Sequence, residues 1–465
     1  MQFNSFVFLL FFLVVYALHE LARRSVRAQN LLLLGASWVF YAAWDWRFLG
    51  LLILSTLVDW FIALRMPGAS PRGRKALLGV SLTGNLGMLA LFKYADFFIE
   101  SMVELLAALG VATDARRLGI VLPVGISFYT FQTLSYTVDV YRGQLPPRRS
   151  LLDFALYVAF FPQLVAGPIE RATRLLPQLE LPRRASADQR VQGSWLILWG
   201  LFKKVVIADT CASWVDAVYD APAPVGSEVL LATYAFAYQI YCDFSGYSDI
   251  ARGLGKLLGI ELMRNFERPY LARSPSDLWH RWHVSLSTWL RDYLYIPLGG
   301  SWRGTLLTYR NLMLTMLLGG LWHGAAWNFV LWGGFHGALL ALERRWRGSA
   351  APPRPGWVHA LAVVGTFHLT CFGWLLFRAT SLAHIGRLLS GFGSTLITEQ
   401  AARIAGGLLF LAGLLWAIEL WLENADDPRT RPGWNALGPL VVGGLLALLI
   451  LLAPPEGRRF LYFQF

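Results

Sequence analysis

At residues 319–328 the chain reads Gly-Gly-Leu-Trp-His-Gly-Ala-Ala-Trp-Asn, inside an apolar run from Leu318 to Gly337. The imidazole of His323 therefore lies among glycines and indole rings, in a segment apolar enough to enter a bilayer. Membranes disfavour ionisable side chains, so such a histidine indicates either a functional site or a hydrogen bond to a neighbouring helix. The glycines allow another backbone or an acyl chain to approach closely.

The composition around this stretch is that of a membrane protein. The 465 residues are 56 % hydrophobic and only 15 % charged, and the mean hydropathy is +0.47. A soluble globular protein of this size is less apolar, so we expect a polytopic protein in a lipid bilayer. The net charge of +12 does not indicate nucleic acid here, because the basic residues fall mainly in short loops between apolar runs.

The apolar runs predict an all-α protein with about eleven transmembrane helices, at about 20 residues per span, plus re-entrant or interfacial helices. The first run, Phe3 to Leu21, has no basic residue before it, so we expect a retained helix rather than a cleaved signal peptide. The run from Gly119 to Val140 is rich in hydroxyl side chains, which suits a helix packed inside protein. We find no internal repeat and no low-complexity linker, and therefore expect one domain over residues 1–465.

The segment from Pro275 to Gly300 is helical in period yet carries several charges. A lipid-facing span would lose roughly 2.5–3.5 kcal/mol for each central charge, so the segment must be buried in protein or lie along an interface as an amphipathic helix. On a continuous helix, His280 and His283 would share a face and could ligate a metal together with His323. A membrane di-iron site needs more than the eight histidines of this chain, and the three scattered cysteines form no zinc motif. We expect no metal.

Several motifs resemble the membrane-bound O-acyltransferase family, in the branch that contains the alginate O-acetyltransferases. Residues 161–169 read Phe-Pro-Gln-Leu-Val-Ala-Gly-Pro-Ile, and residues 241–249 read Tyr-Cys-Asp-Phe-Ser-Gly-Tyr-Ser-Asp. Arg-Asn-Phe at 264–266 and Pro-Tyr at 269–270 follow, and then come the two histidine stretches. The resemblance covers nearly the whole chain. It implies a ring of helices around a thin centre, with a tunnel that leads to buried histidines.

The resemblance also implies which residues act. The principal histidine of the family matches His323, and its partner matches His283. The family pattern is looser around His280, which we therefore treat as a supporting residue. The other expected supporting residues lie in matching motifs and are Trp322, Asp292, Arg291 and Asn328. We expect the last three to hold helices together through buried hydrogen bonds.

The expected chemistry is acyl transfer from a thioester to a hydroxyl. This reaction must remove a proton from a poor nucleophile, a task suited to an imidazole that burial keeps neutral. We expect His323 to be the general base and His283 to orient the thioester or polarise its carbonyl, although the roles could be exchanged. The expected donor is acetyl-CoA, and no cofactor is implied.

The end of the sequence carries a further motif. Phe-Leu-Tyr-Phe-Gln-Phe at 460–465 resembles a terminal Phe-x-Tyr-x-x-Phe signature of alginate-type members. The resemblance implies that Tyr462 is a nucleophile that carries the acyl group, for which a base such as His323 must be near because a phenol has a pKa of about 10. The alternative is an aromatic anchor at the membrane interface.

The expected function is therefore O-acetylation of an exported polysaccharide, such as alginate, by a protein of the bacterial inner membrane. The resemblance implies periplasmic partner acetyltransferases of hydrolase fold, which complete the transfer. The alternatives are D-alanyl or other acyl transfer to a cell-envelope polymer, a transporter, and a scaffold of a glycan export complex. Transporters often show repeated halves with broken helices, whereas the histidine stretches occur once here.

Overall fold

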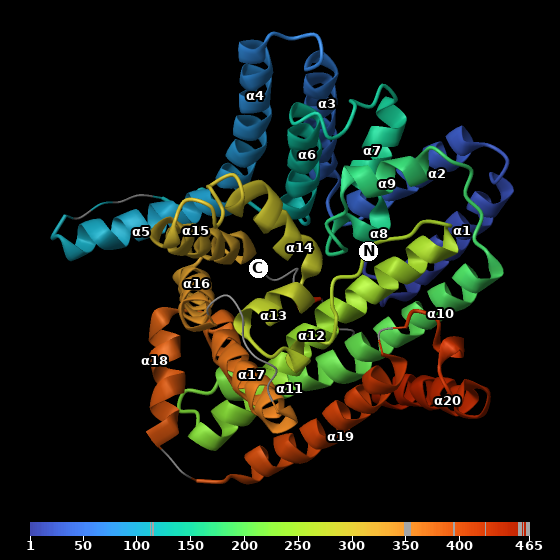
Figure 1. Cartoon of the computed structure of the whole chain (residues 1–465). Coiled ribbons are helices and arrows are strands. Elements are labelled where there is room, and N and C mark those ends of the chain that lie inside the picture. The colour runs from blue at the N-terminus through green and yellow to red at the C-terminus, as the bar shows by residue number, and fades with distance from the viewer. Residues whose placement is uncertain are drawn as a thin grey trace. The chain divides into compact units, whose positions relative to one another are not determined.

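The computed structural model describes residues 1–465 except 112, 114–115, 348–354, 394–395, 424, 454–457, 459 and 462–465. Every regular element in this part of the chain is a helix (Figure 1), which confirms the all-α class. Among the described residues, five helical segments are long and apolar enough to cross a membrane: Trp46–Arg65, Pro71–Ala108, Gly356–Arg378, Glu399–Leu422 and Trp434–Leu452. The chain is a multi-pass membrane protein.

The chain forms two compact units, of which unit 1 contains residues 1–186 and 255–262. Its helices are α1 (Phe6–Leu21), α2 (Val26–Ala42), η1 (Trp46–Phe48), α3 (Leu49–Arg65), α4 (Pro71–Leu89), η2 (Ala90–Tyr94), α5 (Ala95–Ala108), α6 (Ile126–Tyr141), α7 (Leu151–Ala159), α8 (Phe161–Leu164) and α9 (Ala172–Leu179). The hydroxyl-rich helix predicted around residues 119–140 is α6. Its polar side chains are buried as predicted, for example Thr130, Thr133 and Thr137.

Unit 2 contains residues 187–254 and 263–465. Its first helices are α10 (Ala187–Leu201), η3 (Phe202–Ala208), α11 (Asp209–Tyr219), most of α12 (Gly226–Leu257), η4 (Pro269–Leu271), α13 (Pro275–Arg281), α14 (Val284–Leu290) and η5 (Arg291–Tyr295). They are followed by α15 (Thr305–His323), α16 (Trp327–Arg347), α17 (Gly356–Arg378), α18 (Leu382–Ser390), η6 (Gly391–Gly393), α19 (Glu399–Leu422), η7 (Pro428–Thr430) and α20 (Trp434–Leu452). Nothing in the sequence predicts the division into two units, because no linker separates them.

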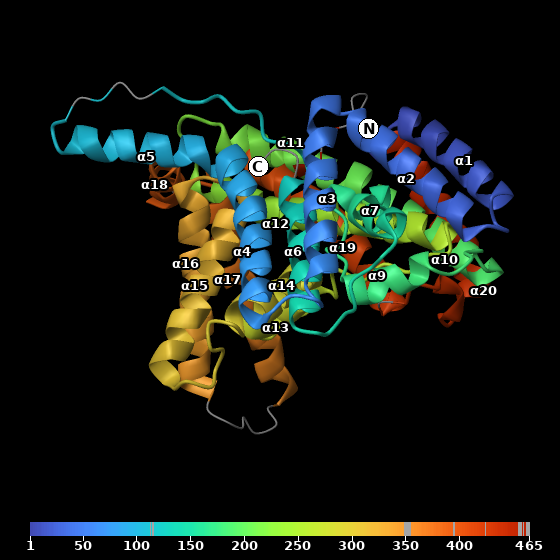
Figure 2. The same cartoon turned by 90° about the horizontal axis from the view of Figure 1, so that it is seen from above.

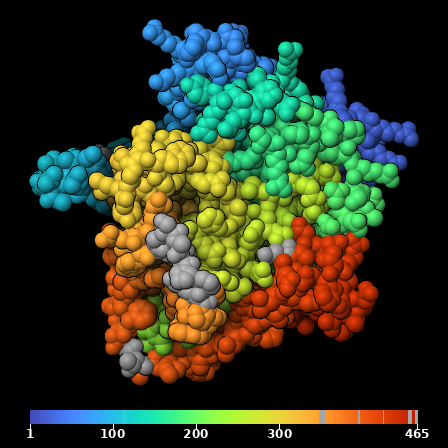
Figure 3. Space-filling model, in the orientation of Figure 1, coloured from blue at the N-terminus to red at the C-terminus, as the bar shows by residue number. Residues whose placement is uncertain are grey.

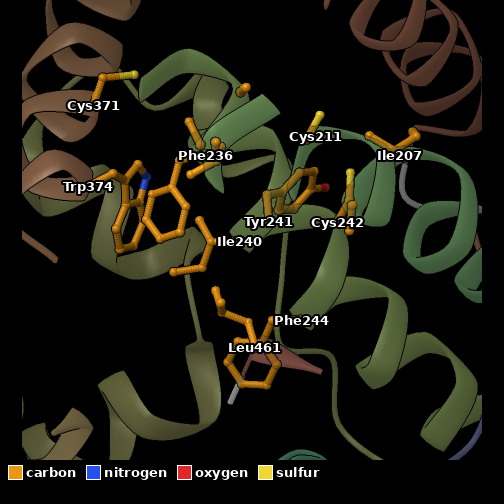
Figure 4. Close-up of a cluster of buried hydrophobic side chains, with 14 of the residues drawn as sticks. Ile207, Cys211, Phe236, Ile240, Tyr241, Cys242, Phe244, Cys371, Trp374 and Leu461 are labelled. Atoms are coloured by element: carbon orange, nitrogen blue, oxygen red, sulfur yellow. The ribbon is translucent and has the colours of Figure 1, made fainter. Parts of the chain in front are cut away.

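Helix α12 supplies much of the core of unit 2. Phe236, Ile240 and Phe244 recur every fourth residue, which places them on one face of the helix. They are buried in an apolar cluster that also contains Trp374 of α17 and Leu461 of the C-terminal segment (Figure 4). This face of α12 therefore shares one apolar cluster with α17 and Leu461.

Candidate active site

The chain breaks its helix at His283, where the sequence predicts a continuous helix. α13 ends at Arg281, Trp282 is extended, and His283 takes the left-handed conformation with φ 44° and ψ 53° before α14 begins. That prediction of continuity is wrong because the backbone around the break pairs with residues far away in the sequence. The N–H of Glu267 donates to the carbonyl of Arg281, and the N–H of Val284 donates to the carbonyl of Asn265, both at 3.0 Å.

Asn265, from the Arg-Asn-Phe motif, also holds the break through its side chain. Its Oδ1 accepts the N–H of Ser285 at 3.2 Å, and its Nδ2 donates to Ser248 Oγ of α12, also at 3.2 Å. Asn265 is buried, where an amide without partners would cost free energy. The motif therefore fixes the position of His283 relative to α12.

The imidazole of His283 is completely buried. Its ring meets the ring of Phe244 edge to face, with 4.6 Å between centroids, and Ser285 Oγ lies 3.5 Å from Nδ1. Burial lowers the pKa of His283 well below its ordinary value of 6.5, and the nearby His323 lowers it further. His283 is therefore neutral at physiological pH and able to accept a proton.

His323 is the last residue of α15 and only 6 % exposed. Its ring lies among aromatic rings, with centroid distances of 5.2 Å to Trp332 of α16 and 5.4 Å to Phe377 of α17. The ring of Trp322 lies 5.1 Å from that of His323 and 6.1 Å from that of His283. The structure thus brings both predicted histidines against one shared indole, in apolar surroundings.

Two glycines allow α15, which ends at His323, to run side by side with α16 (Figures 1 and 2). A Cβ atom on Gly320 would collide with the carbonyl oxygen of Phe329, and one on Gly333 would collide with the carbonyl oxygen of Met316. The sequence predicts such a close backbone approach from the glycines beside His323. The contact sets the distance between His323 on α15 and Trp332 on α16.

His280 lies apart from the histidine pair. Its side chain is exposed, and its Nδ1 bonds to the carbonyl of Ser276 one turn earlier in α13, at 2.7 Å. Because the helix breaks at 282–283, His280 and His283 do not share a helix face, so the shared-face expectation is wrong. In the described part of the chain, no three His, Cys, Asp or Glu side chains form a group that could hold a metal ion.

The remaining predicted residues are divided. Asn328 is buried, and its Nδ2 donates to the carbonyl of Ala379 just after α17 at 2.7 Å, a contact of the helix-linking kind expected for it. Arg291 and Asp292 instead pair with each other at 2.7 Å, with the Arg291 side chain 57 % exposed, so a buried link between helices is the wrong expectation for Arg291. Both residues belong to η5, and Figure 3 shows the yellow stretch of the chain near residue 300 at the surface. Tyr462 lies outside the described residues.

Sequence reasoning missed His336 on α16. This histidine is buried, and its ring lies 4.9 Å from Trp332 and 5.2 Å from Trp279 between centroids. Neither ring nitrogen has a hydrogen-bond partner within the described part of the chain. Gly373 of α17 makes room for it, since a Cβ there would lie 2.8 Å from Nε2. The signal available in the sequence was the spacing of Trp332 and His336, four residues apart on one helix face.

Comparison with known proteins identifies the family. The model of the membrane-bound O-acyltransferase family matches residues 145–385, which include both histidines of the pair. The chain belongs to the membrane-bound O-acyltransferase family. It is an O-acyltransferase, as the resemblance implies.

Three relatives illustrate the similarity within this family. A probable alginate O-acetylase of Pseudomonas aeruginosa is 44 % identical over 90 % of this chain and 81 % of its own length. A probable alginate O-acetylase of Pseudomonas putida is 39 % identical over the full length of both chains. A peptidoglycan O-acetyltransferase of Helicobacter pylori is 35 % identical over 84 % of this chain and 79 % of its own. The chain is thus a membrane O-acetyltransferase whose relatives modify polysaccharides.

Proposed function

We propose that this protein moves acetyl groups from a cytoplasmic donor, acetyl-CoA, across the bacterial inner membrane for O-acetylation of an exported polysaccharide such as alginate. The alginate O-acetylases among the relatives support acetyl as the group and alginate as the polymer. Periplasmic acetyltransferases of hydrolase fold then take the acetyl group and complete its transfer to the polymer.

The observation that carries this proposal is the histidine pair around Trp322. Two buried imidazoles contact one indole, and the apolar rings of Phe244, Trp332 and Phe377 surround them. Such surroundings exclude water, which would otherwise hydrolyse an activated acetyl group. They also keep His283 neutral.

In the proposed reaction, His323 takes the proton of the acceptor hydroxyl while the hydroxyl oxygen attacks the carbonyl carbon of the acetyl thioester. A carbon–oxygen bond forms, the carbon–sulfur bond breaks, and the proton passes from His323 to the departing thiolate. His283 orients the thioester or polarises its carbonyl. The left-handed backbone at His283 supports a role of this kind, because strained conformations gather at functional sites.

Tyr462 is the proposed first acceptor of the acetyl group. Leu461, its neighbour in sequence, is buried in the same apolar cluster as Phe244 (Figure 4), and the ring of Phe244 contacts His283. The phenol oxygen would form an acetyl ester, which the hydroxyl of a periplasmic partner then attacks to release the phenol. In this order of events, the acetyl group passes from the donor to the partner through a tyrosine ester of the chain.

The test replaces His323 by alanine in cells that export the acetylated polymer and measures ester-linked acetate on that polymer. His280→Ala is the matched control, because His280 is exposed and lies apart from the pair. We expect acetate to disappear in the first variant and to stay at the wild-type level in the second, at equal amounts of protein in the membrane and continued polymer export. Unchanged acetate in His323→Ala would refute the mechanism.

A further inference from the structure

Unit 2 contains a buried ion cluster, and one of its members, Asp243, precedes Phe244 on α12. The ammonium group of Lys204 in η3 donates to Asp209 Oδ1 at 2.8 Å and to Asp243 Oδ1 at 2.7 Å. All three side chains are buried. One ammonium group faces two carboxylates here, so the cluster favours a further hydrogen-bond donor.

The C-terminal segment, described here by Arg458, Phe460 and Leu461, supplies that donor. The backbone N–H of Leu461 donates to the second oxygen of Asp243, Oδ2, at 2.8 Å. Asp243 thus accepts from Lys204 and from the segment at the same time. A backbone N–H that bonds to a buried carboxylate is a charge-assisted contact and is stronger than a bond between neutral groups.

Two neighbouring residues fasten the same segment. The ring of Phe460 meets the ring of Tyr247 at 4.7 Å between centroids, and the ammonium group of Lys204 lies 4.6 Å from the centre of the Phe460 ring. Arg458 pairs with Asp216 of α11 at 2.6 Å. Phe460 and Leu461 are only 1 % and 5 % exposed, so these two residues are not the interfacial anchor that the sequence left open as an alternative.

We propose that Asp243 and Lys204 form a dock that holds the C-terminal segment against α12, and that this dock positions the segment for acyl transfer. The second part rests on the proposed function, in which the segment carries the acetyl group. Asp243 and Phe244 are adjacent on α12: Asp243 holds the segment while Phe244 contacts His283. A segment released from the dock would lose its fixed place relative to the histidine pair.

The dock is tested by cysteine labelling of the full-length protein in detergent. The three natural cysteines are buried, so a Leu461→Cys variant reports mainly on the segment, and it keeps the backbone N–H that bonds to Asp243. We expect a maleimide to label the Leu461→Cys variant slowly when the rest of the chain is unchanged. Adding Asp243→Ala should raise the labelling rate about tenfold or more, the effect of losing one hydrogen bond to a charged group.

Two further variants guard against misfolding. Asp426→Ala removes a carboxylate of unit 2 that pairs with Arg252 and Arg264, and should leave the labelling rate unchanged. Phe460→Ala removes the ring that lies against Tyr247 and Lys204 but keeps the hydrogen bonds of Lys204 to Asp209 and Asp243, and it should raise the rate. Fast labelling in the otherwise unchanged chain, or a rate that neither Asp243→Ala nor Phe460→Ala raises, would overturn the dock.

Acetate on the exported polymer separates the dock from the proposed function. If the segment carries the acetyl group, Phe460→Ala should lower ester-linked acetate in step with the rise in labelling. If Phe460→Ala raises the labelling rate but leaves the acetate level unchanged, the dock exists but does not contribute to acyl transfer. If His323→Ala abolishes acetate while the Leu461→Cys reporter in the same chain is still labelled slowly, the first result supports the proposed function and the second supports the dock.

Discussion

Replacing His283 by glycine and by alanine should reverse the usual order of stability of these two residues. Left-handed backbone at φ 44° costs a non-glycine residue about 1–2 kcal/mol, and glycine escapes this cost. Glycine also gives up one buried methyl group, worth about 0.8 kcal/mol. Because the first term is the larger, we expect His283→Gly to be as stable as His283→Ala or up to about 1 kcal/mol more stable.

The matched control is Leu286, a buried residue inside α14 with helical backbone. There, Leu286→Gly should be less stable than Leu286→Ala by about 1 kcal/mol, the ordinary cost of glycine in a helix. The four proteins are compared by thermal unfolding in one detergent at one scan rate. If glycine is the less stable residue at both positions, His283 is not strained and its conformation gives no evidence of function.

A third substitution at this position, His283→Asn, separates the backbone from the imidazole. Asparagine tolerates left-handed backbone but offers no base, so it should fold well and lose acetyl transfer. If His283→Asn still transfers acetyl groups at the wild-type level, the imidazole of His283 is not needed for the reaction, and its left-handed backbone is not evidence of a catalytic role. Acetate on the exported polymer is the measurement.

Three other predictions follow from buried contacts. The folded protein holds the pKa of His283 well below 6.5, so the unfolded chain binds a proton first as the pH falls. Relative to His283→Asn, the wild-type protein should therefore lose about 1.4 kcal/mol of unfolding free energy per pH unit below about 6.5. Equal pH dependence of thermal unfolding in the two proteins would contradict this. Lys204→Met should cost about 3–5 kcal/mol by leaving two carboxylates without their cation, seen as loss of monodisperse protein in detergent; a normal yield would argue against the cluster. Gly373→Ala should destabilise the protein by about 1–3 kcal/mol by pressing on His336, and His336→Ala should suppress that loss in a double-mutant cycle of thermal unfolding; additive losses would show that the two residues do not touch.

Local chemistry made some of these features predictable from the sequence. The apolar runs indicate the all-α membrane class, because a bilayer allows so few alternatives for a backbone. The glycines around His323 predict the close approach of another backbone, and Gly320 makes that contact against α16. The hydroxyls of α6 predict its burial. In each case the sequence signal lies within one helix, and it needs no knowledge of which distant residue makes the contact.

Features that depend on distant residues were not predictable in this way. Helical periodicity runs through His283 without interruption, and only the pairing with Asn265 and Glu267 reveals why the helix breaks. Position on one continuous helix would also have placed His280 beside His283. His336 looks like one more position of an apolar helix until Trp279 and Gly373, from two other helices, are seen against its ring.

Helix α12 joins the two parts of the proposed mechanism, and its charges explain how it can do so. Lys203 of η3 pairs with Asp249 at 2.6 Å, and Tyr241 donates to Glu419 of α19 at 2.6 Å, so these two polar side chains of α12 have partners inside unit 2. Lipid could not satisfy these groups, and the helix must therefore stay enclosed by protein. An enclosed helix cannot shift on one side alone, because close-packed interiors transmit displacements. Any change that moves Asp243 with the C-terminal segment should therefore also move Phe244 against His283.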